Sequence, residues 1–401
     1  MMIVIIILLC VFSFLVIWQF VGYPSLMGLI ALRWSPKKKD SSYEPYVSII
    51  VPALNEEKVI KTRIDNLLQL DYPGEKYEII VVDDGSADNT SQIVEELVKK
   101  HQTNSEACLK LVRARERKGK ASAINLGKQH AQGDIMLVTD ANSLFDRNVL
   151  KEMMPHFEDP NIGAVGGRYV VSNPENKIAS SESFYWDLEY VMLRGEAALQ
   201  SACFFNGSIN AWRGNIIEVD IKVLSEDLEM AIQIRRAGYR IQYEPEAVAN
   251  EPGATTSVDQ IKQRKRTVIG TLQCMFKHRA YFLLPRDLYS LLIFPSHKGL
   301  AMVSPFTLSA IPILYIIVRD STIIIPHLVA TILAFALMFG ILMLLRARLM
   351  KPEKRTGRTS MPSIFKIAHY VLLNEYIILL AWRDFLFGRH SVLWEKAEST
   401  R

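Results

Sequence analysis

The sequence predicts an α/β domain with a parallel sheet, placed between apolar segments at the two ends of the chain. Between residues 46 and 279, short runs rich in β-branched residues alternate with amphipathic stretches. Repeated strand–helix units of this kind form parallel sheets with right-handed crossovers. Residues 1–21 are almost entirely apolar, and further apolar runs lie at 299–318, 322–345 and 364–387. These terminal runs hold much of the hydrophobic content, which is 49% of 401 residues.

Composition excludes two classes of protein. Lys and Arg number 47 against 42 Asp and Glu, a net charge of +5, and the basic residues are spread along the chain, which argues against a nucleic-acid partner. The four cysteines form no CxxC pair, so they are expected to be reduced thiols of a cytosolic compartment rather than a disulfide framework. They are Cys10, Cys108, Cys203 and Cys274.

The N-terminal run is long enough to cross a membrane, because about 20 helical residues span the ~30 Å hydrocarbon core. A cleaved signal peptide is the alternative, but the run lacks the basic n-region and the small-residue cleavage site that such a peptide needs. Lys37, Lys38 and Lys39 follow the run. By the positive-inside rule, the domain that comes after them faces the cytoplasm.

The two runs at 299–318 and 322–345 predict a membrane hairpin, joined by a short loop with Arg319 and Asp320. A basic stretch follows and predicts a return to the cytoplasm. It contains Arg346, Arg348, Lys351, Lys354, Arg355 and Arg358. Polar residues interrupt the last run: Lys366, His369, Asn374 and Glu375. For residues 364–387, a membrane crossing and an in-plane interfacial helix both stay open.

In the central region, strands are expected at residues 47–53, 77–86, 110–114 and 134–142, and helices at 56–70, 88–100, 120–130 and 225–238. Ligands of parallel sheets bind beyond the carboxyl ends of the strands. Asp83 and Asp84 close the second strand, where two adjacent carboxylates repel each other unless they meet a donor or a cation. A turn and helix cap is the alternative, since DDGSADNT is also good capping sequence.

Asp140 closes the fourth strand in the same topological place, and Asn142 follows two residues later. On an extended segment these two side chains face the same side. Their oxygens then suit a hard cation such as Mg²⁺ or Mn²⁺, together with phosphate oxygens. A helix cap before Leu144 is the alternative.

Ser225, Glu226 and Asp227 open the helix at 225–238. The functional interpretation makes Asp227 a general base, and N-terminal capping is the alternative.

A basic cluster of Arg115, Lys118 and Lys120 follows the third strand, where a helix begins. Lysines and helix N-termini both suit phosphate, while a solvated basic turn is the alternative.

Taken in order, these motifs resemble the family-2 glycosyltransferases of the GT-A fold, and above all the membrane-integrated branch that contains cellulose, chitin, hyaluronan and poly-N-acetylglucosamine synthases. The resemblance covers residues 45–280 strongly and the C-terminal membrane part weakly. The strings that carry it are VSIIVPALNEE, VVDDGSADNT, KGKASAINLG, DAN, FFNGSINAWRG, SEDLEMA and QRKRT. It implies a GT-A (Rossmann-like) domain at 45–280, an N-terminal transmembrane helix at 1–22, and interfacial and transmembrane helices at 281–401.

The resemblance also implies a role for each matching residue. Nucleotide-sugar contacts fall to Pro52, Glu56, Asp83, Asp84, Lys120 and Asp140, and metal binding to Asp140 and Asn142 in the position of the DxD motif. The acceptor side falls to Asn206, Gly207, Ser208, Gln263 and Arg266, and catalysis to Asp227 as base beside Glu226.

Two residues depart from the family pattern. Asn142 replaces the second acid of DxD, which lowers the charge offered to a metal. Thr267 replaces the tryptophan of QxxRW, whose indole stacks on the terminal sugar of a polymer, so processive synthesis is in doubt. Trp212, Trp186 and Trp394 are alternative platforms, although simple packing explains an aromatic residue at any of them.

The function expected from this resemblance is inverting transfer of a sugar from a UDP-hexose or UDP-N-acetylhexosamine to a growing polysaccharide. It uses Mg²⁺ or Mn²⁺ and takes place among the lipids of the cell membrane, on the cytoplasmic side. The alternatives are transfer of one sugar to a lipid-linked or glycolipid acceptor, and a non-catalytic membrane scaffold.

Overall fold

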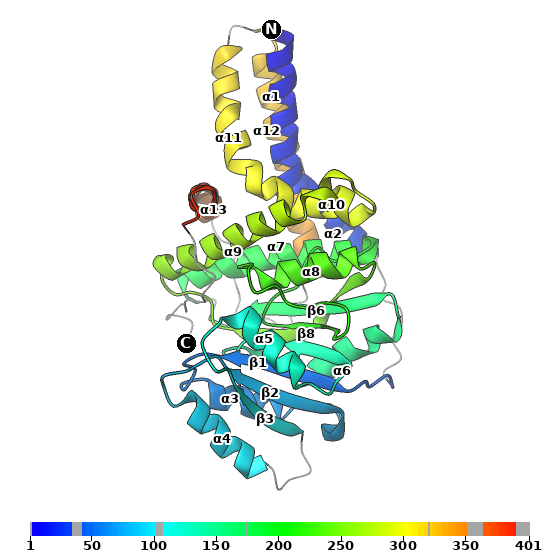
Figure 1. Ribbon diagram of the computed structural model, residues 1–401. Helices are drawn as coiled ribbons and strands as arrows, with labels where there is room; N and C mark the ends of the chain where they lie inside the picture. Colours follow the sequence, from blue (N-terminus) through cyan, green and yellow to red (C-terminus); the bar gives the residue numbers. More distant parts are fainter. Residues whose placement is uncertain are drawn as a thin grey trace.

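The computed structural model describes residues 2–33, 42–101, 107–173, 175–319, 321–350 and 364–389. An α/β domain lies at one end of the molecule and long apolar helices project from the other (Figure 1). Several residues used in the sequence predictions lie outside the described ranges: Lys37, Lys38, Lys39, Asp320, Lys351, Lys354, Arg355, Arg358 and Trp394.

Eight strands form one sheet in the order β3-β2-β1-β4-β7-β6-β8-β5. The predicted strands are β1 (Val47–Ala53), β2 (Tyr77–Asp83), β3 (Cys108–Arg113) and β4 (Ile135–Val138), and they are parallel as expected. The rest of the sheet is β5 (Leu144–Phe145), β6 (Ile162–Val171), β7 (Asn210–Arg213) and β8 (Arg240–Glu251). Because β7 runs antiparallel to both β4 and β6, the complete sheet is mixed, and the prediction of a parallel sheet holds only for its first half.

Helices cover both faces of the sheet, so its central strands are buried on both sides. Ile49 and Val51 of β1 pack in the cluster that contains Ile64, whereas Ile50 packs on the opposite face with Ile124. This alternation follows from the two-residue period of a strand. The helices of the domain are α3 (Ile60–Leu67), α4 (Thr90–His101), α5 (Lys120–Gln129), α6 (Val149–Met153), α7 (Lys177–Leu199), α8 (Glu226–Arg236), α9 (Ser257–Lys277) and α10 (Arg279–Leu283), with short 3₁₀ turns at Gly74–Lys76 and Met154–Glu158.

The helix after β1 is shorter than the predicted 56–70. Asn55 has a φ of 52°, and the chain turns before α3 begins at Ile60. The backbone N–H of Ile60 donates to Glu56 O at 2.9 Å within this turn. Apolar spacing therefore identified the helix but overestimated its length, because Val59 and Leu68, which continue the apolar spacing, lie just outside its two ends.

Three helical segments in the described part of the chain are long and apolar enough to cross a membrane: Met2–Arg33, Tyr289–Ile317 and Ile324–Leu349. The first contains α1 (Met2–Ile17), a π-helical turn (Trp18–Gly22) and α2 (Tyr23–Arg33), and so continues past the predicted 21 residues. The second contains π-helical turns at Tyr289–Ile293 and Pro295–Gly299 and then α11 (Leu300–Ile317), and the third is α12 (Ile324–Leu349). Figure 1 shows α1, α11 and α12 side by side.

Helix α2 lies directly on α7, which connects the apolar helices to the domain. A Cβ added at Gly195 would lie 2.1 Å from Met27 O, so only glycine permits this approach. The last helix, α13 (Ile364–Leu386), is not among the three apolar segments and is seen end-on in Figure 1, across the direction of α11 and α12. It packs on α9 and on the start of α11, where Trp382 Nε1 donates to Met302 O at 2.8 Å. The in-plane alternative for this segment agrees with the arrangement.

Candidate active site

The site begins at the carboxyl ends of three neighbouring parallel strands, β2, β1 and β4. Asp83 is in register with Ala53, which follows Pro52 at the end of β1. Asp140 comes two residues after β4. The predicted placement of the acids at this edge is therefore confirmed, because parallel register brings these distant residues to one place.

Asp83 is held by its own loop. Its Oδ1 accepts hydrogen bonds from the backbone N–H and the hydroxyl of Ser86, at 2.9 and 2.6 Å, and its Oδ2 accepts one from Ser91 Oγ. These bonds are those of the turn and cap alternative. A contact between Asp83 and a nucleotide stays a prediction.

Asp84 holds the loop that leads into α5. Its carboxylate accepts from the backbone N–H of Lys118 at 3.0 Å and of Gly119 at 2.8 Å. Gly119 has a φ of 92°, which glycine adopts without strain. Helix α5 then begins at Lys120, so Asp84 sets the position of that lysine.

Lys120 is the cation at the centre of the site. Its Nζ lies 2.7 Å from Asp140 Oδ1 and 3.0 Å from Glu226 Oε1, and its side chain is 9% exposed. Burial disfavours the ammonium ion, but the charges of Asp140 and Glu226 outweigh it and raise the pKa of Lys120. The lysine is therefore charged in the absence of any ligand.

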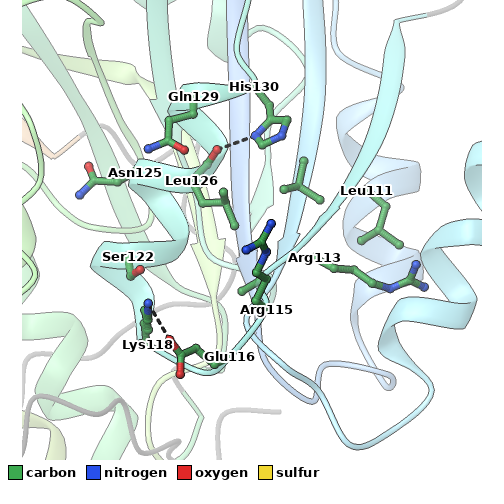
Figure 2. Close-up of a pocket in the computed structure, with 12 residues that line it drawn as sticks. Leu111, Arg113, Arg115, Glu116, Lys118, Ser122, Asn125, Leu126, Gln129 and His130 are labelled. Atoms are coloured by element: carbon green, nitrogen blue, oxygen red, sulfur yellow. Dashed lines mark hydrogen bonds and ion pairs between the residues drawn. The ribbon is translucent and has the colours of Figure 1, made fainter.

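Arg115 and Lys118 were predicted to form one basic cluster with Lys120, and the structure corrects this. Figure 2 shows both of them beside a groove of about 640 Å³ between β3 and α5. Lys118 Nζ lies 2.8 Å from Glu116 Oε1 there. The cluster is divided because Lys120 is the first residue of α5, whereas Arg115 and Lys118 belong to the loop before it. Residues lining the groove are Leu111, Val112, Arg113, Ala114, Arg115, Glu116, Lys118, Ser122, Asn125, Leu126, Gln129 and His130.

Two hydrogen bonds hold the carboxylate of Asp227, the predicted base. Its Oδ1 accepts from Ser225 Oγ at 2.7 Å and from the backbone N–H of Leu228 at 2.8 Å, which fixes the carboxylate. Burial raises the pKa of Asp227, and the neighbouring charge of Glu226 adds to this. Ser225 makes no side-chain cap bond to α8, so the capping alternative does not account for its hydroxyl.

The pKa of Glu226 shifts in the opposite direction to that of Asp227. Burial alone would raise its pKa, but Lys120 and Arg266 outweigh burial and lower it. Arg266 Nη2 lies 3.7 Å from Glu226 Oε2. The two adjacent acids of α8 therefore have different proton affinities, which is a common way to separate a base from a structural charge.

The loop at residues 206–208 closes over this centre. A Cβ added at Gly207 would lie 3.3 Å from Lys120 Nζ and 3.9 Å from Asp227 Oδ2, so the backbone here runs beside both groups. Asn206 Oδ1 accepts from the backbone N–H of Ser208 at 2.7 Å, which stabilises the turn. The structure thus brings Gly207 next to the predicted base and lysine, and Ser208 next to Asp140.

Asp140 and Asn142 do not lie on an extended segment, as the prediction assumed. Strand β4 ends at Val138, and the two residues form a turn in which Ser143 N–H donates to Asp140 O at 3.3 Å. The two residues are nevertheless linked through Glu251 and Ser208. Asn142 Nδ2 donates to Glu251 Oε1 at 3.1 Å, and Ser208 Oγ lies 2.6 Å from Glu251 Oε2 and 3.3 Å from Asp140 Oδ2.

This group of oxygen donors fits a hard divalent cation. Two carboxylates and an amide carbonyl are the ligand types that Mg²⁺ and Mn²⁺ take. The bond from Asn142 Nδ2 to Glu251 orients the amide, and the Oδ1 of Asn142 is the atom that suits a metal. Sequence reasoning missed Glu251, because it ends β8 more than 100 residues after Asn142 and belongs to none of the motifs used.

Arg63 is a second residue that sequence reasoning missed. It is fully buried on α3, where Nη2 donates to Thr139 Oγ1 at 2.5 Å and Nη1 to Asn66 Oδ1 at 2.7 Å. Burial lowers the pKa of Arg63 to about 9, although the charges of Asp140 and Glu251 act in the other direction. A cation beneath the turn compensates part of the negative charge of these acids.

Helix α9 supplies one of its two predicted residues to the centre. Arg266 reaches Glu226, but Gln263 is exposed and its side chain makes no hydrogen bond within the described ranges. Thr267, in the position of the expected tryptophan, is also exposed and bonds back to Gln263 O at 3.2 Å. A Cβ at Gly270 would lie 2.5 Å from the backbone N of Ser225, so this glycine lets α9 reach the start of α8.

Comparison with known proteins agrees with this fold. The model of glycosyl transferase family group 2 matches residues 135–343, more than half of the chain, and that of glycosyl transferase family 2 matches residues 48–216. The chain therefore belongs to the family-2 glycosyltransferases, a class of transferases, and its catalytic domain has the GT-A fold. A non-catalytic scaffold has no support from these matches.

Three curated relatives show how the family is represented. Beta-monoglucosyldiacylglycerol synthase of Synechocystis is 28% identical over 64% of this chain and 56% of that protein. The probable glycosyltransferase YdaM of Bacillus subtilis is 31% identical over 62% and 60%, and poly-beta-1,6-N-acetyl-D-glucosamine synthase of Staphylococcus aureus is 29% identical over 59% and 57%. The chain thus spans less than two thirds of the length of these relatives.

One solved structure is similar over almost the whole chain. It is the mannosyltransferase PcManGT from Pyrobaculum calidifontis, in complex with GDP-Man and Mn²⁺. The TM-score is 0.67 at 24% identity, and the match covers 96% of this chain and 100% of that chain. At this identity the likeness establishes the shared fold.

Proposed function

We propose that the chain transfers a sugar from a nucleotide sugar to an acceptor hydroxyl with inversion at the anomeric carbon. One observation carries the proposal: the backbone at Gly207 runs beside Lys120 Nζ and Asp227 Oδ2 together. A carboxylate that takes a proton and a cation that attracts a departing phosphate therefore flank the same backbone segment.

In this mechanism Asp227 takes the proton of the acceptor hydroxyl. The acceptor oxygen forms its bond to the anomeric carbon while the bond from that carbon to the diphosphate oxygen breaks. The nucleoside diphosphate leaves with the bonding electrons, and Lys120 and Arg266 stabilise its charge. A single in-line displacement of this kind inverts the anomeric configuration and needs no covalent enzyme intermediate.

Mg²⁺ or Mn²⁺ is the proposed cofactor. Asp140 and Asn142 would hold it, with Glu251 beside them, and a divalent cation there supplies Lewis-acid stabilisation of the diphosphate. Asp84 also keeps the loop before α5 in place. The proposed contacts to the nucleotide sugar are Pro52, Glu56, Asp83, Asp84, Lys120 and Asp140. UDP-hexose and UDP-N-acetylhexosamine are the proposed donors.

The proposed acceptor is a growing polysaccharide at the cytoplasmic face of the cell membrane, by analogy with the branch that the sequence resembles. A lipid-linked or glycolipid acceptor that receives one sugar is a second candidate. Two observations favour the second: the exposed Thr267 offers no aromatic platform, and three apolar helices in the described ranges are few for a polymer channel. The relatives include synthases named for each kind of product.

The experiment that tests this function is donor turnover. The full chain in detergent is supplied with Mg²⁺ or Mn²⁺ and a panel of UDP- and GDP-sugars, and nucleoside diphosphate release is measured. Release from one donor, abolished by a chelator and by Asp140→Asn, is the expected result. Release that persists unchanged with chelator and in Asp140→Asn contradicts the proposed site.

A further inference from the structure

Three side chains next to the proposed metal site have no part in the mechanism above. Tyr169 lies on β6, and Glu182 and Trp186 lie one turn apart on α7, so these two share a face of that helix. The rings of Tyr169 and Trp186 are 4.8 Å apart between centroids and tilted by 46°. We call these three residues the aromatic–acid cluster.

The cluster adjoins the Asp140–Glu251 side of the active site. A Cβ added at Gly253, two residues after Glu251, would lie 3.2 Å from Glu182 Oε2. Tyr169 is close enough to the acids to feel their charge, since burial first, and then the carboxylates of Glu251, Glu182 and Asp140, raise the pKa of its phenol. The cluster is therefore continuous with the site and not a separate surface feature.

Three polar atoms of the cluster make no hydrogen bond to the described part of the protein. Glu182 Oε2 is buried and has no hydrogen bond within the described part of the chain. The Tyr169 hydroxyl and the Trp186 indole N–H likewise make none there, although both residues are only partly buried. Unpartnered polar groups gathered beside an active site indicate a position that a ligand fills.

The chemistry of the cluster suits a sugar ring. A pyranose has C–H groups on its faces, which pack on an indole, and hydroxyls at its rim, which donate to a carboxylate. The other platforms predicted from sequence do not offer this combination. Trp212 is fully buried in β7, and Trp394 lies outside the described residues. Trp186 is thus the half-buried indole that lies next to the acids.

The location points to the acceptor sugar and not to the donor nucleotide. The proposed nucleotide contacts lie at the ends of β1 and β2, whereas α7 lies between the sheet and the apolar helices in Figure 1. An acceptor that is held at a membrane arrives from the side of α7. Arg264 of α9 also packs on this helix, with its guanidinium 4.9 Å from the centroid of the Tyr185 ring.

We propose that Tyr169, Glu182 and Trp186 form the subsite for the sugar ring of the acceptor, so that the acceptor is a carbohydrate or a sugar-bearing lipid and not a bare lipid alcohol. This inference rests on the proposed function, because it assigns the second substrate of the same site. The indole of Trp186 stacks on the sugar ring. The carboxylate of Glu182 accepts a hydrogen bond from one sugar hydroxyl, and the phenol of Tyr169 donates a hydrogen bond to another.

Two measurements on the full chain in detergent test the subsite. The first is binding, by calorimetry, of tetrasaccharides of glucose and of N-acetylglucosamine, which requires no turnover. Saturable binding of one of them is expected, weakened about tenfold in Trp186→Ala, restored in Trp186→Phe, and unchanged in the matched control Trp382→Phe. Glu182→Gln weakens binding without removing a ring. Binding of neither sugar, or equal binding in Trp186→Ala, overturns the subsite.

The second measurement separates this inference from the proposed function. With the active donor and the sugar acceptor, the acceptor KM is expected to rise in Trp186→Ala and to stay at the wild-type value in the matched control Trp382→Phe. If the wild-type protein releases no nucleoside diphosphate even when donor and acceptor are both present, this contradicts the proposed function alone, because the binding assay still decides the subsite. An unchanged acceptor KM, or equal transfer to diacylglycerol vesicles and to the sugar acceptor, overturns the subsite while the transferase function stands.

Discussion

Lys120 Nζ lies 2.7 Å from Asp140 Oδ1, although Lys120 begins helix α5 and Asp140 follows strand β4. Asp84 fixes the loop before Lys120, and the parallel register of β1 and β4 fixes the turn that carries Asp140. The ion pair therefore joins the predicted phosphate-binding lysine to the predicted metal-binding acid in one site. Lys120 Nζ also pairs with Glu226, and both side chains are largely buried, so the loss of this lysine leaves buried carboxylates without a cation.

Lys120→Met is expected to destabilise the fold as well as to impair transfer. The substitution leaves Asp140 and Glu226 without their shared cation, and breaking a buried ion pair costs about 3–5 kcal/mol. Thermal unfolding checks the stability, and kcat/KM for the donor checks the activity. Lys151→Met, which removes an exposed pair with Asp71, is the control and should change neither. Wild-type stability in Lys120→Met would show that the pair has no such role.

The pH dependence of transfer should report on Asp227. A base acts only when it is ionised, so kcat/KM falls as the pH drops through the pKa of Asp227, which burial and Glu226 raise above the usual range near 4. Glu226→Gln removes a negative charge beside Asp227 and so lowers that pKa, which moves the acidic limb to lower pH. Glu218→Gln, on an exposed side chain, should leave the profile in place. An acidic limb that stays put in Glu226→Gln contradicts the assignment of the base.

Asn142→Asp is expected to tighten metal use. The substitution adds a carboxylate to the oxygen group of Asp140 and Glu251, and the cation concentration for half-maximal activity should fall by roughly tenfold, because ligand charge sets affinity. Without cation, the added charge lies against Glu251, so the melting temperature should fall and recover on addition of Mg²⁺ or Mn²⁺. A melting temperature that does not respond to either ion argues against a metal at this turn.

Gly270→Ala tests how α9 is docked. The new Cβ would lie 2.5 Å from the backbone N of Ser225, and overpacking of this kind costs about 1–3 kcal/mol. Because α9 is pushed away from α8, Arg266 moves from Glu226 and kcat should fall with the stability. Gly340→Ala, where no atom lies within 4 Å, is the matched control and should retain both. Equal stability and equal kcat in the two variants would show that the close approach of Gly270 to Ser225 is not needed for activity.

Local signals predicted the first half of the sheet well. Strand β1 has the predicted bounds, because a run of buried β-branched residues between turn residues has few other solutions. The mixed second half was not predicted, since β6, β7 and β8 pair through long-range antiparallel and parallel contacts that leave no short motif. Glu251 is placed at the site by the pairing of β8 with β6, so it was not predicted either. The division of Arg115 and Lys118 from Lys120 depends on the residue at which α5 begins, which spacing alone does not determine.

The assignment of Asp227 as the catalytic base is tested most directly by comparing Asp227→Asn with Asp71→Asn, which changes an exposed acid on the domain surface. Transfer is measured at saturating donor, and donor binding is measured by calorimetry in the same preparations. We expect Asp227→Asn to lower kcat by about 10²- to 10⁴-fold with donor affinity retained, while Asp71→Asn matches wild type. Transfer near the wild-type rate in Asp227→Asn would contradict the assignment of this carboxylate as the base.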